Sequence, residues 1–181
     1  MKLLALTALS AALLLPAPGA SSPSATPVTP AAPVHCQIPC GIYGDKMRIE
    51  MMMEDLATIE KGMAKIHEIE ALGEAGNRNQ IVRWVMNKDQ HAQAIQDQVA
   101  SYWLAQRIKA PKEESVEAQN SYHRQLAALH AITVSAMKCK QTVDVAHVKS
   151  LRASAKQFSK MYFSEEDLKH LEEHVGDNEG R

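Results

Sequence analysis

Side chains able to bind a metal gather in one short segment near the amino end of the chain. Residues 35–43 read HCQIPCGIY. A chain that begins at His35 offers a metal its α-amine, an imidazole, two thiolates and a backbone amide nitrogen that can lose its proton. Two nitrogens and two sulfurs in one plane suit a divalent ion such as nickel or copper. Pro39 and Gly41 bend the chain so that both sulfurs can reach one centre.

The cysteine count leaves other uses of this segment open. Three cysteines are an odd number for an exported protein. Cys36 and Cys40 can form a small disulfide in a non-enzymatic secreted helical protein, or belong to a carrier that captures nickel or copper and passes it on. A thiol oxidoreductase is disfavoured, because three residues separate these cysteines and no βαβ pattern accompanies them. We expect the lone Cys139 to be a buried, small apolar side chain.

The residues before His35 have the composition of an export signal followed by a linker. Lys2 gives a short positive region, and residues 3–15 are apolar but too few to span a bilayer comfortably. We predict a signal peptide at 1–20 and a removed pro-segment or linker, rich in Pro, Ser and Ala, at 21–34. A membrane anchor retained as one helix is the alternative. We expect a periplasmic or secreted protein without membrane attachment once the signal is removed.

Cleavage between Val34 and His35 is a requirement of the metal-binding interpretation. An uncut chain has no α-amine at His35, and signal peptidase alone would leave about a dozen extra residues. A second, processing protease is therefore implied, and no residue in the sequence identifies it. The charge balance of 20 Lys plus Arg against 21 Asp plus Glu gives no basic stripe, so we expect no nucleic-acid partner.

Apolar residues after the metal-binding segment recur at helical spacing. The first helix carries such a face at Ile49, Met52, Met53, Leu56, Ile59, Met63, Ile66 and Ile69. A second helix is expected from about Gln80 to Lys109 and a third from about Glu113 to Lys138. The side chains that we expect to point inward from the later helices are Trp84, Ile95, Val99, Tyr102, Val116, Leu126, Leu129, Ile132–Val134, Val148, Leu151, Ala155, Phe158 and Tyr162.

These patterns predict an all-α fold. An antiparallel four-helix bundle is expected at 46–175, preceded by an N-terminal metal-binding hook at 35–45. The fourth helix is the one that carries Val148 to Tyr162, and Ser164 begins a short terminal helix as its N-cap. The polar end at 176–181 is expected to fray.

The order of residues in the hook resembles the nickel hook of the nickel-dependent superoxide dismutase family, in which a four-helix bundle follows. Six positions of the nine carry this match. They are His35, Cys36, Pro39, Cys40, Gly41 and Tyr43. Two later segments, Arg48-Ile49-Glu50 and the KDQHA run at 88–92, are similar to further stretches of the same family.

The resemblance implies an enzyme that converts superoxide to oxygen and hydrogen peroxide by Ni(II)/Ni(III) cycling. His35 would supply its α-amine and an axial imidazole. Cys36 would supply its amide nitrogen and its sulfur, and Cys40 the second sulfur. Tyr43 would stand beside the open axial position, and Glu50 would orient the imidazole of His35. The proton donor stays open. The family also implies a homo-hexamer in which a neighbouring bundle shields the hook.

Two residues depart from the family's pattern. Gln37 stands where family members have an Asp, and His91 stands where they have an Arg that completes the link to Glu50. His91 either acts in this supporting position or is an interhelix histidine paired with a carboxylate. Lys46 and Arg48 either attract anionic superoxide or are solvated charges at a helix start.

Overall fold

The computed structural model describes residues 44–73, 77–112 and 115–176, which all belong to one contact unit, His35–Arg181. The predicted signal peptide and pro-segment lie outside these residues, as does the hook except for its last two positions. The predicted frayed end also lies outside them, apart from Gly176.

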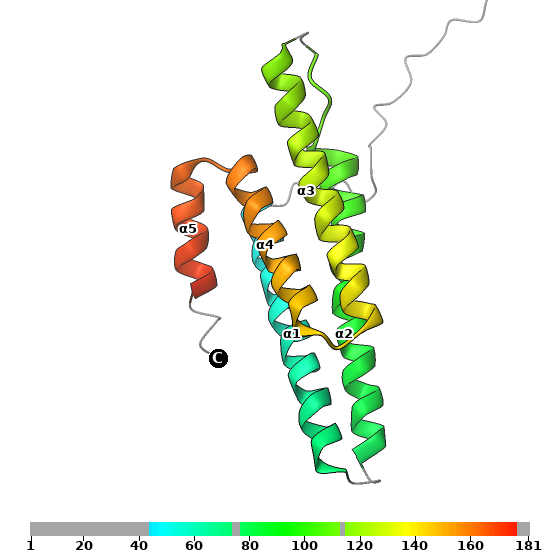
Figure 1. Cartoon of the computed structure of the whole chain (residues 1–181). Helices are drawn as coiled ribbons and strands as arrows, with labels where there is room; N and C mark the ends of the chain where they lie inside the picture. Colours follow the sequence, from blue (N-terminus) through cyan, green and yellow to red (C-terminus); the bar gives the residue numbers. More distant parts are fainter. Residues whose placement is uncertain (1–43, 74–76, 113–114, 177–181) are drawn as a thin grey trace, which may run out of the picture. The chain divides into compact units, whose positions relative to one another are not determined.

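The described residues form helices and no strand, which confirms the predicted all-α class for this part of the chain. The helices are α1 (Asp45–Leu72), α2 (Arg78–Gln98), η2 (Val99–Arg107), α3 (Val116–Gln141), α4 (Val145–Tyr162) and α5 (Glu165–Gly176) (Figure 1). None of these helices, within the described ranges, is long and apolar enough to cross a membrane.

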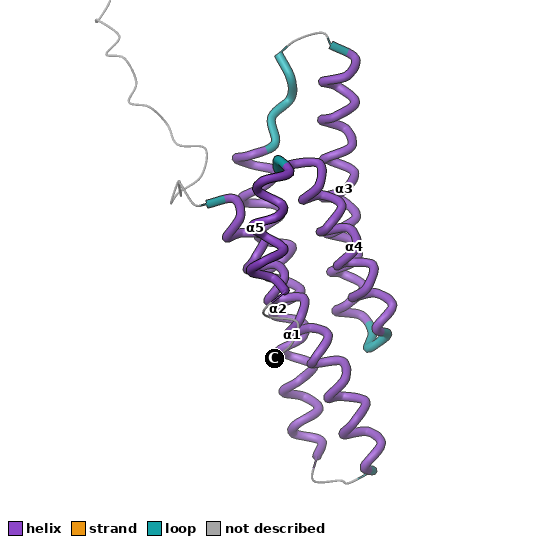
Figure 2. Tube along the Cα trace, turned by 90° about the vertical axis from the view of Figure 1, so that its left-hand side faces the viewer, coloured by secondary structure: helices purple, strands orange, loops and turns teal. Residues whose placement is uncertain are grey.

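Four of the helices pack as a bundle. α1 contacts α2 and α4, and α3 contacts the same two helices, so the four enclose one core. Successive helices run in opposite directions, as Figures 1 and 2 show. The short α5 packs on α1 and α4. This arrangement buries one apolar stripe from each long helix.

The predicted apolar face of α1 is the centre of the core. Seven of its eight residues are buried, and only Ile69, near the end of the helix, is half-buried. Burial of such side chains contributes roughly 1.5–3 kcal/mol each relative to exposure. The helix ends at Gly73, which has φ of 63°. Glycine takes this left-handed conformation without a Cβ penalty and therefore closes the helix.

The second helix differs from its expected form. Instead of one α-helix to Lys109, α2 ends at Gln98 and continues as a π-helix, η2, to Arg107. The Ile108 amide closes it by donating to the Trp103 carbonyl oxygen, five residues back, at 2.9 Å. The wider turn lets the adjacent Tyr102 and Trp103 both face inward, with exposures of 5 % and 0 %.

The later helices begin at polar caps. The Ser115 side chain accepts from the Ala118 amide at the start of α3, and Asp144 does the same for Ala146 at the start of α4. The expected N-cap of the terminal helix is confirmed, because Ser164 Oγ accepts from the Asp167 amide at 3.2 Å. Each cap satisfies a backbone donor that the first helical turn leaves unpaired.

One predicted inward residue is wrong. Val116 is 76 % exposed, because it is the first residue of α3, whose first turns extend past α4 (Figure 1). Farther along α3, Leu129 and Ile132 are fully buried, while Leu126 and Val134 are half-buried at its flank. On α4 the predicted stripe is buried as far as Phe158, and Tyr162 is half-buried.

Candidate metal centre

The predicted site residues divide between two parts of the chain. Glu50 on α1 and His91 on α2 are described by the structure. The others lie outside the described residues: His35, Cys36, Pro39, Cys40 and Tyr43. The described structure therefore shows the part of the bundle that directly follows the hook in the chain. This part begins at Asp45, the first residue of α1.

The carboxylate of Asp45 is held by three donors from two other helices. Tyr102 of η2 donates its hydroxyl to Oδ1 at 2.5 Å. Tyr162, at the end of α4, donates its hydroxyl to Oδ2 at 2.8 Å. Arg107, the last residue of η2, donates Nη2 to the same oxygen at 2.5 Å and Nε to the Tyr162 hydroxyl at 3.3 Å. We call these four residues the Asp45 clamp.

The pKa values of Asp45, Tyr102 and Tyr162 are all shifted by burial and by the hydrogen bonds among the clamp residues. Burial acts to raise the pKa of Asp45, but hydrogen bonds from Tyr102, Arg107 and Tyr162 outweigh it, so the pKa lies below its ordinary value. Burial and the hydrogen bond to Asp45 raise the pKa of Tyr102 to about 12. The same two causes raise the pKa of Tyr162. The clamp is therefore an ionised carboxylate with neutral phenols across the neutral pH range.

Aromatic packing backs the clamp. The Trp103 ring makes edge-on contacts with Tyr102 and Tyr162, at centroid distances of 5.1 and 5.0 Å, and with Phe158 at 4.9 Å. Edge-to-face pairs at this separation are favourable beyond the area that they bury. Trp103 thus fixes both phenol rings, and the phenols fix the carboxylate.

Two charged residues beside Asp45 are also engaged with neighbouring helices. Lys46 forms an ion pair with Asp167 of α5 at 2.6 Å. The Arg48 guanidinium lies over the Tyr102 ring, 5.0 Å from its centroid, and the Arg48 carbonyl oxygen accepts from Gln98 Nε2 at 2.6 Å. These contacts tie the first turn of α1 to its surroundings.

Glu50 lies five residues after Asp45 on the same helix and is half-buried. Within the described part of the chain, its carboxylate forms no hydrogen bond or ion pair. A half-buried carboxylate is stabilised by a donor, because partial desolvation penalises its charge. Among the described residues, no donor meets the Glu50 carboxylate.

His91 has a carboxylate partner on α1, and that partner is Asp55. His91 Nδ1 lies 2.6 Å from Asp55 Oδ1. Two further contacts, of Asp45 with Tyr102 and of Arg48 with Gln98, show the same antiparallel pairing of the two helices. In this pairing Glu50 lies opposite residue 97 of α2. Six residues of helix then separate His91 from that level, about 9 Å. Because a histidine side chain is shorter than an arginine side chain, His91 meets Asp55 and not Glu50. Burial raises the pKa of Asp55, and the hydrogen bond with His91 partly opposes this shift.

The bundle residues that the structure describes also include possible metal ligands. No group of three or more His, Cys, Asp or Glu in the described ranges lies close enough to hold a metal ion. Cys139 is a free cysteine with 0 % exposure, which confirms its expected role as a small apolar side chain. Burial raises the pKa of its thiol to about 11, so it is a poor metal ligand and nucleophile.

Sequence reasoning missed the Asp45 clamp. Tyr102 and Tyr162 were expected only as inward-facing residues, and Asp45 and Arg107 were given no role. An acid at a helix start is a common signal, since it favours the helix dipole. Nothing in the sequence pairs it with residues 57, 62 and 117 positions away.

Comparison with known proteins bears on the hook and the bundle together. A family model described as nickel-containing superoxide dismutase matches residues 30–166, a range that includes the hook and most of the bundle. No curated protein and no solved structure matches the chain. The matched range contains His35, Cys36 and Cys40, and an imidazole and two thiolates are ligands that suit divalent nickel. The chain therefore belongs to the nickel-containing superoxide dismutase family, whose members are oxidoreductases with nickel as cofactor.

Proposed function

We propose that this chain dismutes superoxide to oxygen and hydrogen peroxide at the hook formed by residues 35–43. One observation carries the proposal: the family match spans the hook, and within it His35, Cys36 and Cys40 keep the order that the nickel site requires. Bound nickel would supply the one-electron Ni(II)/Ni(III) chemistry that accepts an electron from one superoxide and returns it to another.

The hook residues supply the donors for this metal. His35 would give its α-amine and imidazole, Cys36 its amide nitrogen and thiolate, and Cys40 the second thiolate. Thiolate and deprotonated amide are electron-rich donors, and they stabilise the higher oxidation state that aqueous nickel does not readily reach. Pro39 turns the chain so that Cys36 and Cys40 can bind the same ion.

Two residues next to the donors would control orientation and access. Tyr43 would hold superoxide or water by its hydroxyl group near the bound nickel. Glu50 would accept a hydrogen bond from the His35 imidazole and fix its ring, as carboxylates commonly do for metal-bound histidines. The half-buried Glu50, with no partner among the described residues, supports this role. His91, held by Asp55, would act on the hook only through α1.

Maturation and assembly complete the proposal. Residues 1–20 would direct export to the periplasm or the medium, and a second protease would cut Val34–His35 to create the α-amine. The mature chains would assemble as a homo-hexamer that shields the reactive thiolates of each hook. Arg48, near the junction of hook and bundle, would add positive charge for anionic superoxide, whereas the charge of Lys46 is balanced by Asp167.

Intact mass and elemental analysis test the proposal directly. Protein purified from a nickel-fed host is expected to begin at His35, to hold about one nickel per chain and to consume superoxide. A chain that begins near Ser21, lacks nickel and is two hydrogens lighter would instead carry a Cys36–Cys40 disulfide, and the proposal would fail.

Cysteine variants sharpen the same test. Cys36→Ser and Cys40→Ser are each expected to remove nickel and at least 99 % of the activity, roughly the loss when a metal centre loses a ligand. Cys139→Ala is the matched control, because its thiol is buried in the bundle. The control should keep nickel and activity. Equal losses in all three variants would show a general effect of cysteine removal and would contradict the hook.

A further inference from the structure

The start of α1 is fixed in an unusual way. Gly44, the N-cap, has no side chain that could cap the helix, so no side-chain cap holds the direction in which the chain enters α1. The holding contacts come instead from η2 and α4 through the Asp45 clamp. Three donors on one largely buried carboxylate are more than a helix start requires, because first-turn acids are normally solvated.

The clamp lies where the hook joins the bundle. Tyr43 is two residues before Asp45, so their Cα atoms are at most about 7 Å apart. Glu50 is five residues after Asp45 on the rigid helix, a rise of about 7.5 Å. In the function proposed above, His35 at the far end of the hook must meet Glu50. Asp45 therefore lies between the hook and Glu50 in the chain.

We propose that Asp45 is a positioning residue for the dismutase reaction, and that its clamp aligns the hook with Glu50. This inference rests on the proposed function. Asp45 does not touch the metal or superoxide. It fixes the direction in which the hook leaves α1, so that Tyr43 and the His35 imidazole are in place before superoxide arrives. Loss of the clamp leaves every metal ligand present but loosens their alignment.

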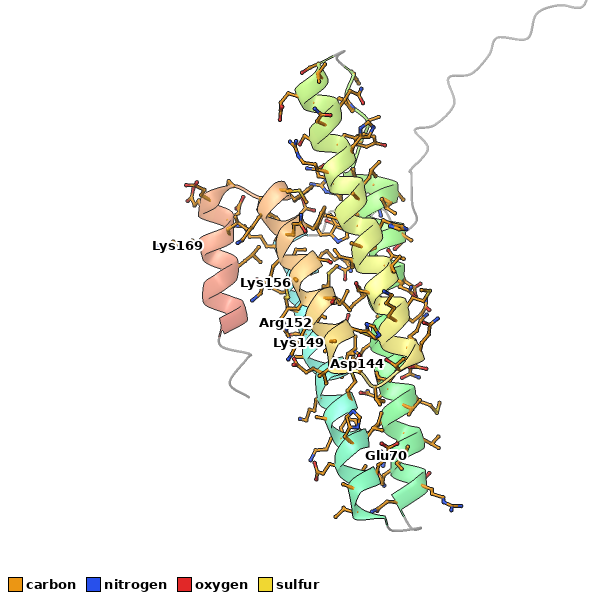
Figure 3. All side chains as sticks on the ribbon, viewed as in Figure 1. Glu70, Asp144, Lys149, Arg152, Lys156 and Lys169 are labelled. Atoms are coloured by element: carbon orange, nitrogen blue, oxygen red, sulfur yellow. The ribbon has the colours of Figure 1, made fainter. Side chains whose placement is uncertain are left out.

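Asp45→Asn is the decisive variant, and Glu60→Gln is its matched control. Both change a carboxylate of α1 to an amide, and both partners are arginines on other helices. Glu60 Oε2 pairs with Arg152 Nη2 of α4 at 2.8 Å, fifteen residues farther along α1 (Figure 3 labels Arg152). Asparagine has the size of aspartate but no negative charge. The hydrogen bonds from Arg107, Tyr102 and Tyr162 are therefore weakened, because they no longer go to an ionised carboxylate.

The experiment compares the nickel-loaded wild-type protein with both variants. For Asp45→Asn we expect nickel content near the wild-type value, but kcat/KM reduced about tenfold or more, because small misalignments of reacting groups are costly. The electron paramagnetic resonance spectrum of the oxidised centre should also change, since it would report how the ligands are placed around the nickel. In the nickel-free protein, amide hydrogen exchange at 48–51, where the hydrogen-bonded amides of α1 begin, should be faster. Glu60→Gln should match the wild type in all of these measurements.

A Tyr162→Phe variant covers the case in which Asp45→Asn does not fold. It removes one donor to Asp45 and keeps the ring that packs on Trp103 and Phe158. A severalfold loss of kcat/KM with a changed spectrum is expected. A folded Asp45→Asn or Tyr162→Phe variant with wild-type kcat/KM, spectrum and exchange would overturn the positioning role alone. A wild-type protein without nickel or activity would overturn the proposed function, and this inference with it.

Discussion

Lys88 is a buried lysine whose ammonium group contacts the neighbouring Asp89 carboxylate on α2 and two carbonyl oxygens near the end of α3. It is 1 % exposed, and its Nζ donates to Asp89 Oδ1 at 2.8 Å, to the Cys139 carbonyl at 2.5 Å and to the Lys140 carbonyl at 3.1 Å. The last carbonyls of a helix have no intrahelical donor and carry partial negative charge. The Lys88 side chain therefore closes the α3 end and ties it to α2.

Lys88→Met tests this role at a single side chain. Methionine has a similar shape but no donor, and it leaves the two carbonyls of α3 without their lysine. We expect the free energy of unfolding to fall by about 2–4 kcal/mol, the range for a buried polar network that loses one partner. Urea denaturation measures this change. Lys138→Met, at an exposed lysine of the same helix end, should cost under about 0.5 kcal/mol. Similar losses in both variants would contradict the capping role.

The site could be predicted from sequence only where its residues are contiguous. Five of the predicted site residues stand within nine positions of one another, so their order alone indicates a metal hook. The four residues of the Asp45 clamp come from three elements, and Asp45 and Tyr162 are 117 positions apart. The partner of His91 depended on helix register, which sets whether a short imidazole reaches Glu50 or Asp55.

Among the elements, periodicity predicted the helices but not how the second one is wound. The apolar stripe of α1 is nearly complete, so its helix and its buried face were both predictable. The π-helix η2 was not, because its signal is a pair of adjacent buried aromatics, Tyr102 and Trp103, that a regular α-helix also tolerates. The inward placement of Val116 was wrong because periodicity does not show where a helix extends beyond the helices that pack against it.

Gly62 sets how closely α1 and α2 approach. A Cβ placed on it would lie 3.4 Å from Lys88 Cβ and 3.6 Å from the Trp84 carbonyl oxygen, which is ordinary van der Waals contact. Gly62→Ala is therefore expected to fit and to change the free energy of unfolding by no more than about 1 kcal/mol, since alanine also favours the helix. Gly62→Leu must push the helices apart at Lys88, and we expect it to cost about 1–3 kcal/mol.

Thermal melting of both Gly62 variants distinguishes close packing from mere helix propensity. Ala and Leu have nearly equal helix propensities. A leucine variant as stable as the alanine variant would show that the helices do not meet closely at this point. A larger loss of stability for leucine would fit the close approach.

At the scale of the whole molecule, the clamp links folding to pH because it joins the start of α1 to η2 and α4. The folded pKa of Tyr102 is about 12 against an ordinary value of 10.0. A raised folded pKa means that its stabilising contribution is complete below pH 10 and is lost as pH rises through about 12. Asp45 has a lowered pKa, so its contribution is complete above pH 3.8 and is lost as pH falls further. The clamp is intact between these limits.

We therefore expect an alkaline loss of stability that Tyr102→Phe partly removes. Burial and the hydrogen bond to Asp45 raise the pKa of Tyr102, and Arg107 and Arg48 partly oppose this shift. Ionisation of Tyr102 would place its negative charge beside that of Asp45. Thermal melting from pH 8 to pH 12 should show a steeper fall for wild type than for Tyr102→Phe, which is less stable at pH 8. Tyr122→Phe, a tyrosine outside the clamp, should follow the wild-type slope. Parallel curves for wild type and Tyr102→Phe above pH 10 would mean that the Tyr102 phenol is not coupled to Asp45 in the folded protein.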